Sequence, residues 1–395
     1  MLILRNGNPE VIGASSVDGN SKEIARGTNE GFVTSPHHGA GAFLTHLTTE
    51  LLSCWQRYEV DNIDRVRFAY PSSTKAAVKN RVHELASYVG FYRASTIPHD
   101  QLRDVFGVDG LDHAYGLLED QLSRDVFVKV LAYRILGHRH VRLSLNNAQY
   151  WELRQSVEKY VEKRNTVTQI PVLGSLDLCN FKGIRLHVHR LAILHAFLLE
   201  QYRCVRASVG VKPGDVVIDA GGCWGDTALY FAQDAAQVFC FECMPSNIKI
   251  IRENLALNPA LGAKISVIQR ALWSRSREKF VFKEMGPGSQ PAADGVGVEV
   301  ETQSLDDFVS ANSVERVDFI KMDIEGAEPE ALVGAERTIR KHRPKLAISI
   351  YHDVRHFASI PRWIAGLDLG YRLYLDHFTI HAEETVLFAS VESRT

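Results

Sequence analysis

The most constraining feature of this sequence is an apolar segment that runs into an acid and a glycine-rich loop. The apolar run 216–218 leads directly to Asp219, which is followed by Gly221, Gly222 and Gly225. A glycine at 221 lets the backbone turn sharply, and a glycine at 225 lets the following helix begin close to a ligand. The order of strand, glycine loop and helix therefore predicts an α/β sheet that binds a ligand at the carboxyl end of this strand.

Four more apolar runs follow the first one, and helical segments separate them. Continuous apolar strands of this kind are buried on both faces of a parallel sheet, and ligands bind such sheets at the carboxyl ends of the strands. We therefore predict a doubly wound, Rossmann-like α/β domain over residues 170–395. Its five expected strands lie at 216–218, 238–241, 265–268, 319–320 and 346–350.

The first 165 residues have a different pattern. Residues 1–40 are rich in Gly, Ser, Asn and Thr without apolar periodicity, which predicts an irregular segment. Apolar side chains then recur at helical spacing near residues 43–55, 78–89 and 118–135. Residues 41–165 are therefore predicted to form a mainly α-helical accessory domain.

Composition and charge narrow the class of protein. Of 395 residues, 45% are hydrophobic and 23% are charged, which is ordinary for a globular protein that needs neither disulfides nor a structural metal. The formal net charge is −2. Binding to nucleic acid usually needs an excess of clustered positive charge, so we do not expect nucleic acid as a partner. No apolar run approaches the ~20 residues that span a bilayer, so we expect a cytoplasmic protein without a membrane partner. The oligomeric state is left open, a homo-oligomer included.

The spacing of the glycines separates two classes of cofactor. A dinucleotide fingerprint needs G-x-G-x-x-G, and here the third required glycine is absent. The Asp219 carboxylate is unfavourable beside a diphosphate but favourable beside an α-ammonium group, which S-adenosylmethionine carries. Glu242 ends the second strand 23 residues after Asp219, near the ~20-residue interval at which an acid of this fold class meets ribose hydroxyls. A solvated strand-end charge is the alternative interpretation of Glu242.

The predicted cofactor site extends to the loop after the third strand. In this architecture that loop faces the adenine, although ordinary packing explains its small apolar residues equally well. The residues predicted to bind S-adenosylmethionine are Asp219, Gly221, Gly222, Gly225, Thr227, Glu242, Ala271 and Leu272.

A dense run of charged residues ends the fourth strand. In an extended segment Lys321, Asp323 and Glu325 share one face, and buried charges of this kind need partners or a purpose. Acids placed there could deprotonate or orient a substrate hydroxyl, or bind a divalent cation; an ion pair that ties the strand to the next helix is the alternative. His352, after the fifth strand, is a candidate general base or a structural histidine. The predicted catalytic residues are Asp323, His352, Lys321 and Glu325, and no metal site is assigned.

Other metal-like pairs carry less weight. Cys240 and Cys243 form a CxxC motif with no second pair at zinc-binding spacing. The pairs His138/His140 and His187/His189 have no third ligand in sight. We therefore expect neither zinc nor redox chemistry from them.

The glycine loop after the first strand, the acid at 242, the run 304–308 and the run 321–328 together resemble the FkbM family of methyltransferases over about residues 170–390. The resemblance implies a class I methyltransferase sheet with a closing hairpin near 373–387, and methyl transfer from S-adenosylmethionine to a hydroxyl of a sugar or secondary metabolite. The expected partner is thus a small-molecule or glycan hydroxyl acceptor. The motifs are the first strand with its glycine loop, Phe241-Glu242, Ser304-Leu305-Asp306-Asp307-Phe308 and, most family-specific, Lys321-Met322-Asp323-Ile324-Glu325-Gly326-Ala327-Glu328.

Two residues depart from the family pattern, and two other functions stay as alternatives. Cys243 stands where members usually have proline, and Ser349 where many have an acid, which weakens any metal assignment. An NAD(P)-dependent oxidoreductase would need the missing glycine. A non-catalytic cofactor-binding scaffold would have no need of the strand-four acids.

Overall fold

The structure is a computed structural model that describes residues 41–59, 62–64, 82–83, 85–86, 99–170, 174–284, 288–292 and 295–391. The irregular segment predicted for residues 1–40 lies outside these ranges. The helix predicted at 78–89 lies largely outside them.

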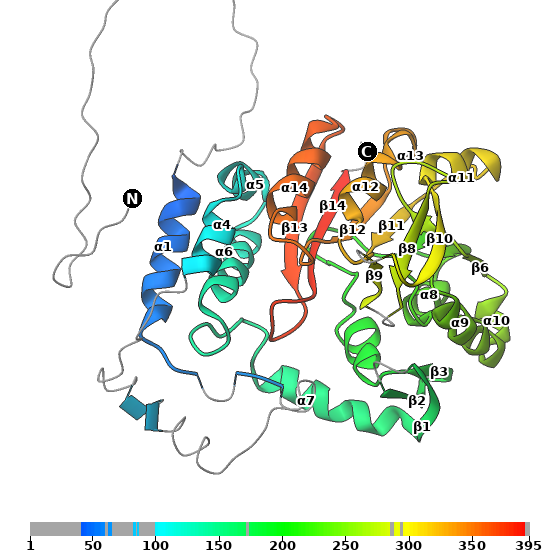
Figure 1. Cartoon of the computed structure of the whole chain (residues 1–395), viewed down its shortest axis with the longest axis horizontal. Helices are drawn as coiled ribbons and strands as arrows, with labels where there is room; N and C mark the ends of the chain where they lie inside the picture. Colours follow the sequence, from blue (N-terminus) through cyan, green and yellow to red (C-terminus); the bar gives the residue numbers. More distant parts are fainter. Residues whose placement is uncertain are drawn as a thin grey trace, which may run out of the picture. The chain divides into compact units, whose positions relative to one another are not determined.

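A seven-stranded sheet of order β13-β14-β12-β11-β4-β5-β6 forms the centre of the C-terminal half (Figure 1). The five strands from β12 to β6 are parallel, whereas β14 runs antiparallel to both β12 and β13. The chain winds outward from β4 in one direction and from β11 in the other, so these two strands flank the switch point at which such sheets bind ligands. The predicted doubly wound sheet and its five parallel strands are confirmed. The strands are β4 (Val216–Ala220), β5 (Gln237–Phe241), β6 (Ile265–Ile268), β11 (Phe319–Met322), β12 (Lys345–Ser349), β13 (Tyr371–His377) and β14 (Thr385–Val391).

Helices cover both faces of this sheet. Neighbouring residues such as Val217 and Ile218 belong to opposite apolar cores, because side chains alternate along a strand. The core of one face includes α8 (Asp226–Ala232) and α9 (Pro245–Leu257), which the short α10 (Pro259–Gly262) follows. The core of the other face includes α11 (Leu305–Ala311), α12 (Glu328–Val333), α13 (Glu336–His342) and α14 (His356–Gly366).

The helices of the N-terminal half share the core of the second face. They are α1 (Ala42–Trp55), α4 (His99–Phe106), α5 (Leu111–Leu117) and α6 (Gln121–Leu136). Figure 1 shows α5 and α6 beside α14 and β13, with which they are in contact. The last helix of this part, α7 (Ala148–Ser156), is followed by a 3-10 turn at Val157–Tyr160. The mainly helical character predicted for the N-terminal region is confirmed in its described part.

Two small sheets lie beside the main one, and neither was predicted. The first is an antiparallel meander that precedes β4 and is followed by a π-helical turn at Ile193–Leu198. The second lies between β6 and β11 in the sequence. The strands are β1 (Val161–Ile170), β2 (Gly174–Phe181) and β3 (Ile184–Val188) in the first sheet, and β7 (Ala271–Leu272), β8 (Lys279–Lys283), β9 (Gln290–Pro291) and β10 (Val298–Gln303) in the second. None of the helices in the described ranges has the length and apolarity of a membrane span.

Candidate active site

The glycine loop between β4 and α8 packs directly against the end of β11. Gly221 has a φ of +82°, and a Cβ at this position would lie 1.9 Å from the Asp323 carbonyl oxygen. Gly225 has a φ of +79° immediately before α8. A Cβ on Gly222 would lie 2.2 Å from the Cys240 sulfur. Each predicted glycine is therefore required by its backbone conformation, by a close approach, or by both.

The buried ammonium group of Lys321 holds this loop in place through hydrogen bonds. Nζ of Lys321 donates hydrogen bonds to the carbonyls of Ala220 (2.9 Å) and Gly221 (2.6 Å) and lies 3.1 Å from Oδ1 of Asp219. The Thr227 hydroxyl donates to the other Asp219 oxygen at 2.8 Å. Burial opposes the charge of Lys321, but Asp219 and Asp323 raise its pKa. The Asp219 carboxylate is thus neutralised inside the protein, and it lines neither of the two cavities described below.

The Glu242 carboxylate ties the end of β5 to the same loop. Its oxygens accept the backbone N–H groups of Cys243 (2.8 Å), Met244 (2.8 Å) and Cys223 (2.9 Å). Burial raises the pKa of this carboxyl, and the three N–H groups oppose that shift. Glu242 is buried, so the alternative of a solvated strand-end charge is wrong.

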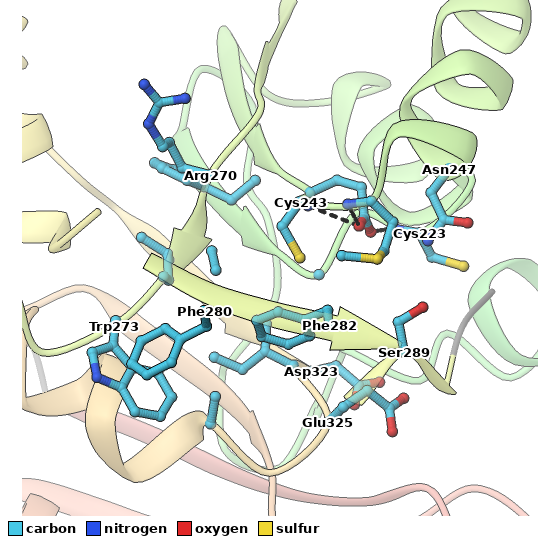
Figure 2. Close-up of a pocket in the computed structure, with 18 residues that line it drawn as sticks. Cys223, Cys243, Asn247, Arg270, Trp273, Phe280, Phe282, Ser289, Asp323 and Glu325 are labelled. Carbon is cyan, nitrogen blue, oxygen red and sulfur yellow. Dashed lines mark hydrogen bonds between the residues drawn. The ribbon is translucent and has the colours of Figure 1, made fainter. Parts of the chain in front are cut away.

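The first of two cavities lies between this loop and the β7–β10 sheet (Figure 2). Four predicted cofactor residues, Gly221, Glu242, Ala271 and Leu272, line it. Figure 2 shows Cys223, Cys243 and Asn247 at one end and Trp273 and Phe280 at the other. The sequence did not predict this wall, which includes Asn247, Arg270, Trp273, Phe280, Phe282 and Ser289.

A second cavity adjoins the first, and Gly221, Cys223, Asp323 and Glu325 line both. Its lining combines charged, aromatic and small apolar side chains. Most of these residues lie outside the motifs of the sequence, because they come from the segment between β3 and β4 and from the β13–β14 turn. They include His189, His195, Gln201, Tyr202, Trp224, Asp226, Thr227, Tyr351, Glu383 and Glu384.

The Asp323 side chain is held in place where the two cavities meet. The Tyr202 hydroxyl donates to Oδ2 at 2.7 Å, and the Tyr351 hydroxyl donates to Oδ1 at 3.2 Å. Nε2 of His352 lies 3.4 Å from Oδ1. Burial works to raise the pKa of Asp323, but the charges of His352 and Lys321 and the two hydroxyls hold it below its ordinary value. The carboxylate is therefore ionised at neutral pH.

The His352 imidazole lies among three carboxylates and behind the cavities. Its Nδ1 lies 3.0 Å from Oε1 of Glu328, and its Nε2 lies 3.7 Å from Oε2 of Glu325 in addition to the contact with Asp323. Burial lowers the pKa of His352, but the carboxylates outweigh it and raise the pKa to about 9. The ring is therefore an imidazolium at neutral pH, and it lines neither cavity.

Glu325 is the acid whose charge changes near neutral pH. It follows β11 with a φ of +56° and lines both cavities. Burial, together with the charges of Asp323, Glu328 and Glu384, raises its pKa to about 8 against the opposing effect of His352. At neutral pH this carboxyl is mostly protonated.

Among the described residues, one group of three side chains has the types and the spacing of metal ligands. The ligand atoms of Asp323, Glu328 and His352 lie within 4.8 Å of one another. A metal ion would have to displace the proton that His352 holds between the carboxylates. Cys240 and Cys243 of the CxxC motif are free thiols.

Comparison with known proteins identifies the domain that carries this site. The model of the methyltransferase FkbM domain matches residues 208–373. This part of the chain is therefore similar to the FkbM methyltransferase domain. The matched region runs from the segment before β4 into β13 and contains the glycine loop, Glu242 and the strand-four acids.

Individual relatives match less of the chain. The 2-O-methyltransferase NoeI of Sinorhizobium fredii is 29% identical over 154 residues, which are 33% of this chain and 62% of NoeI. The chain therefore spans about three-fifths of the length of this curated relative. Among solved structures, methyltransferase FkbM from Methylobacillus flagellatus aligns with a TM-score of 0.47 and 17% identity over 81% of this chain and 71% of that one. Aeropyrum pernix fibrillarin, solved with S-adenosylmethionine, aligns with a TM-score of 0.34 and 14% identity over 57% and 86%. Residues 208–373 are thus similar to a methyltransferase domain, and the main sheet has the doubly wound order that the family resemblance implied.

Proposed function

We propose that this chain transfers a methyl group from S-adenosylmethionine to a hydroxyl oxygen of a sugar or secondary metabolite. The observation that carries the proposal is the meeting of two different cavities at Gly221, Cys223, Asp323 and Glu325. Donor and acceptor molecules bound in adjoining cavities would be aligned at these residues. The name of the relative NoeI, a 2-O-methyltransferase, also favours a hydroxyl acceptor.

The residues of the first cavity fit S-adenosylmethionine. The Glu242 oxygens accept three N–H groups and keep lone pairs for the ribose hydroxyls. Ala271, Leu272 and Phe282 offer an apolar wall for the adenine. Asp219, already paired with Lys321, fixes the glycine loop rather than touching the cofactor. When bound, the cofactor supplies a methyl group that is already activated on a sulfonium.

Asp323 and Glu325 have different roles toward the acceptor hydroxyl: Asp323 orients it, and Glu325 removes its proton. The hydroxyls of Tyr202 and Tyr351 orient the Asp323 carboxylate. This carboxylate accepts a hydrogen bond from the acceptor hydroxyl and thereby directs the hydroxyl oxygen toward the methyl group. Glu325 removes the proton once its own carboxyl is ionised. His352 acts as a positioning residue, because it contacts Asp323 but lines neither cavity.

Methyl transfer from tritiated S-adenosylmethionine to a panel of sugars and hydroxylated metabolites tests this function. We expect kcat/KM to rise as pH rises through about 8, where Glu325 ionises. Glu325→Gln should lose this rise, and Asp323→Asn should lower kcat by about 10²–10⁴-fold. Both variants should keep their affinity for S-adenosylhomocysteine in calorimetry.

The matched control is Glu330→Gln, which removes an exposed acid of α12 away from both cavities. It should behave as the parent protein does. Unchanged turnover in both active-site variants would contradict the assigned roles. NAD binding in place of S-adenosylhomocysteine would revive the oxidoreductase alternative, and cofactor binding without transfer to any hydroxyl would favour the scaffold.

A further inference from the structure

We propose that Arg134, near the end of α6, is a positioning residue for the Asp323 carboxylate. This inference rests on the proposed function, in which Asp323 orients the acceptor hydroxyl. Arg134 lies outside residues 208–373, the region similar to the FkbM methyltransferase domain. Contacts of α6 with three parts of the C-terminal half support the inference: strand β13, the segment after β12 and the β13–β14 turn.

The beginning of α6 is fixed to β13, beside which the helix lies in Figure 1. Asp120 caps the helix by accepting the N–H of Ser123 at 2.8 Å, and its second oxygen accepts from Nε of Arg206, also at 2.8 Å. Arg206 donates in turn to the Asp376 carboxylate of β13 at 2.6 Å. The hydroxyl oxygen of Ser123 accepts the N–H of Leu375 at 2.9 Å. The helix therefore has a fixed position relative to the main sheet.

The other end of α6 reaches the segment after β12 through Arg134. Nη2 of Arg134 donates a hydrogen bond to the carbonyl of Tyr351, and its guanidinium lies over the ring of Phe357, 5.5 Å from the centroid. Burial lowers the pKa of Arg134, whereas the charges of Glu383 and Asp353 oppose that shift. A buried cation held among such groups has few other positions open to it, so Arg134 fixes the backbone of Tyr351.

The Tyr351 segment carries this position to Asp323. The Tyr351 hydroxyl donates to Oδ1 of Asp323 at 3.2 Å, and Nε2 of His352 lies 3.4 Å from the same oxygen. These two contacts with Oδ1 come from adjacent residues, of which the first is bound by Arg134 through its carbonyl. Loss of Arg134 would therefore loosen the contacts at Oδ1, whereas the Tyr202 hydroxyl would still donate to Oδ2.

Tyr133, the neighbour of Arg134, contacts the β13–β14 turn. Nε2 of His381 accepts the N–H of Asp64 at 3.2 Å, so the ring proton is on Nδ1. Nδ1 lies 3.4 Å from the Tyr133 hydroxyl oxygen, which accepts this proton in a hydrogen bond. His381 belongs to the turn that also carries Glu384, a lining residue of the second cavity. Adjacent residues of α6 thus contact two of the segments that line this cavity.

Steady-state kinetics of the full chain test this role, with the best acceptor from the panel that tests the proposed function. Arg134→Met should lower kcat about 10²-fold, the effect of misplacing a reacting group by about 1 Å. The Kd for S-adenosylhomocysteine should stay unchanged in calorimetry, because Arg134 is not among the described lining residues of either cavity. Arg134→Lys keeps the charge and an N–H donor, so it should recover most of the lost kcat.

Fluorine NMR reads the contact itself without turnover. 3-Fluorotyrosine in place of Tyr351 reports the surroundings of the hydroxyl, and Asp323→Asn in this labelled chain gives the shift that marks loss of the carboxylate. We expect Arg134→Met to move the signal in the same direction, and Arg134→Lys to leave it near the parent position. A residue that only stabilised the fold would leave the signal in place in both variants.

Two control variants separate this role from general stability. Val128→Ala shortens another buried side chain of α6, which is 1% exposed, and Arg103→Met removes an exposed arginine of α4. Below their unfolding midpoints, both should keep the kcat and the fluorine signal of the parent protein. If Arg134→Met does not fold, Arg134→Gln replaces it with the same expected results.

An unchanged fluorine signal in Arg134→Met, an unchanged kcat, or equal losses in Arg134→Met and Val128→Ala would overturn the proposal. These results are separable from the proposed function. A chain that transfers no methyl group to any acceptor would contradict the proposed function, whereas the fluorine signal would still decide whether Arg134 positions the contact between Tyr351 and Asp323.

Discussion

Most buried charged side chains in this site form ion pairs with one another. Few of them are therefore left to contact a molecule bound in the cavities. Lys321 is bound to Asp219 and to the glycine-loop carbonyls, and His352 lies between Glu328 and Asp323. Asp323 itself is left facing both cavities. Pairs of titratable groups whose surroundings push their pKa values apart are typical of catalytic sites.

The close packing of Gly221 gives the first prediction. Gly221→Ala should destabilise the protein and abolish measurable S-adenosylhomocysteine binding, since the new Cβ would meet the Asp323 carbonyl 1.9 Å away. Gly214→Ala is the matched control, because Gly214 has a similar φ of +85° and nothing within 4 Å of an added Cβ. The control should lose only the ~1–2 kcal/mol of a left-handed alanine. Calorimetry and urea unfolding measure both effects, and equal losses in the two variants would contradict the contact.

The imidazolium of His352 gives the second prediction, which concerns the pH dependence of stability. The pKa of this group is raised from 6.5 to about 9 in the folded protein, so its contribution to stability is full below pH 6.5 and is lost as pH rises through about 9. The difference in free energy of unfolding between the parent and His352→Gln should therefore be largest near pH 6 and shrink toward pH 9.5. Urea unfolding across this pH range measures it. His113→Gln, at an exposed position of α5, should give no such trend, and a constant difference for His352→Gln would contradict the imidazolium.

At the scale of elements, the sheet between β6 and β11 closes the first cavity with aromatic side chains of β8. Phe280 and Phe282 line the cavity, whereas Val281 between them does not, because side chains alternate along a strand. Phe282→Ala should therefore weaken S-adenosylhomocysteine binding about tenfold, the effect of ~1.5 kcal/mol of lost apolar contact. Val281→Ala on the same strand should change the affinity less than twofold. Calorimetry of both variants decides, and an equal loss in the two would mean that β8 acts only through stability.

The same elements show what could be predicted from the sequence. The five parallel strands are continuous apolar runs between helices, a pattern that burial on both faces imposes. β10 alternates valine with glutamate and β1 carries several charges, so no continuous apolar run marks them. β8 has only the short run Phe280-Val281-Phe282 between two lysines, and no predicted helix flanks it. The glycines and Glu242 were predicted because their roles are local to one strand and its loop. Tyr202 contacts Asp323, and Glu384 lines the second cavity, only because the tertiary fold brings distant segments together. No local sequence motif predicts these two residues.

At the scale of the described molecule from residue 41 onward, one apolar core joins the N-terminal helices to the sheet. Phe127 of α6 is fully buried, and its ring centroid lies 5.6 Å from that of Phe43 in α1 and 5.7 Å from that of Phe357 in α14. A residue shared in this way couples the stability of both parts. We therefore expect these helices and the sheet to unfold together.

Phe127→Ala tests this coupling. The variant should lower the free energy of unfolding by ~3–5 kcal/mol, as expected for a large cavity in a core, and should shift a single transition seen alike by far-UV circular dichroism and tryptophan fluorescence. Leu122→Ala in the same helix, at a side chain that is 54% exposed, should shift it by less than ~0.5 kcal/mol. Two separate transitions, of which only one moves, would mean that the helices form an independent domain. A single shifted transition would show that the stability of the seven-stranded sheet depends on helices that contribute no residue to the described lining of either cavity.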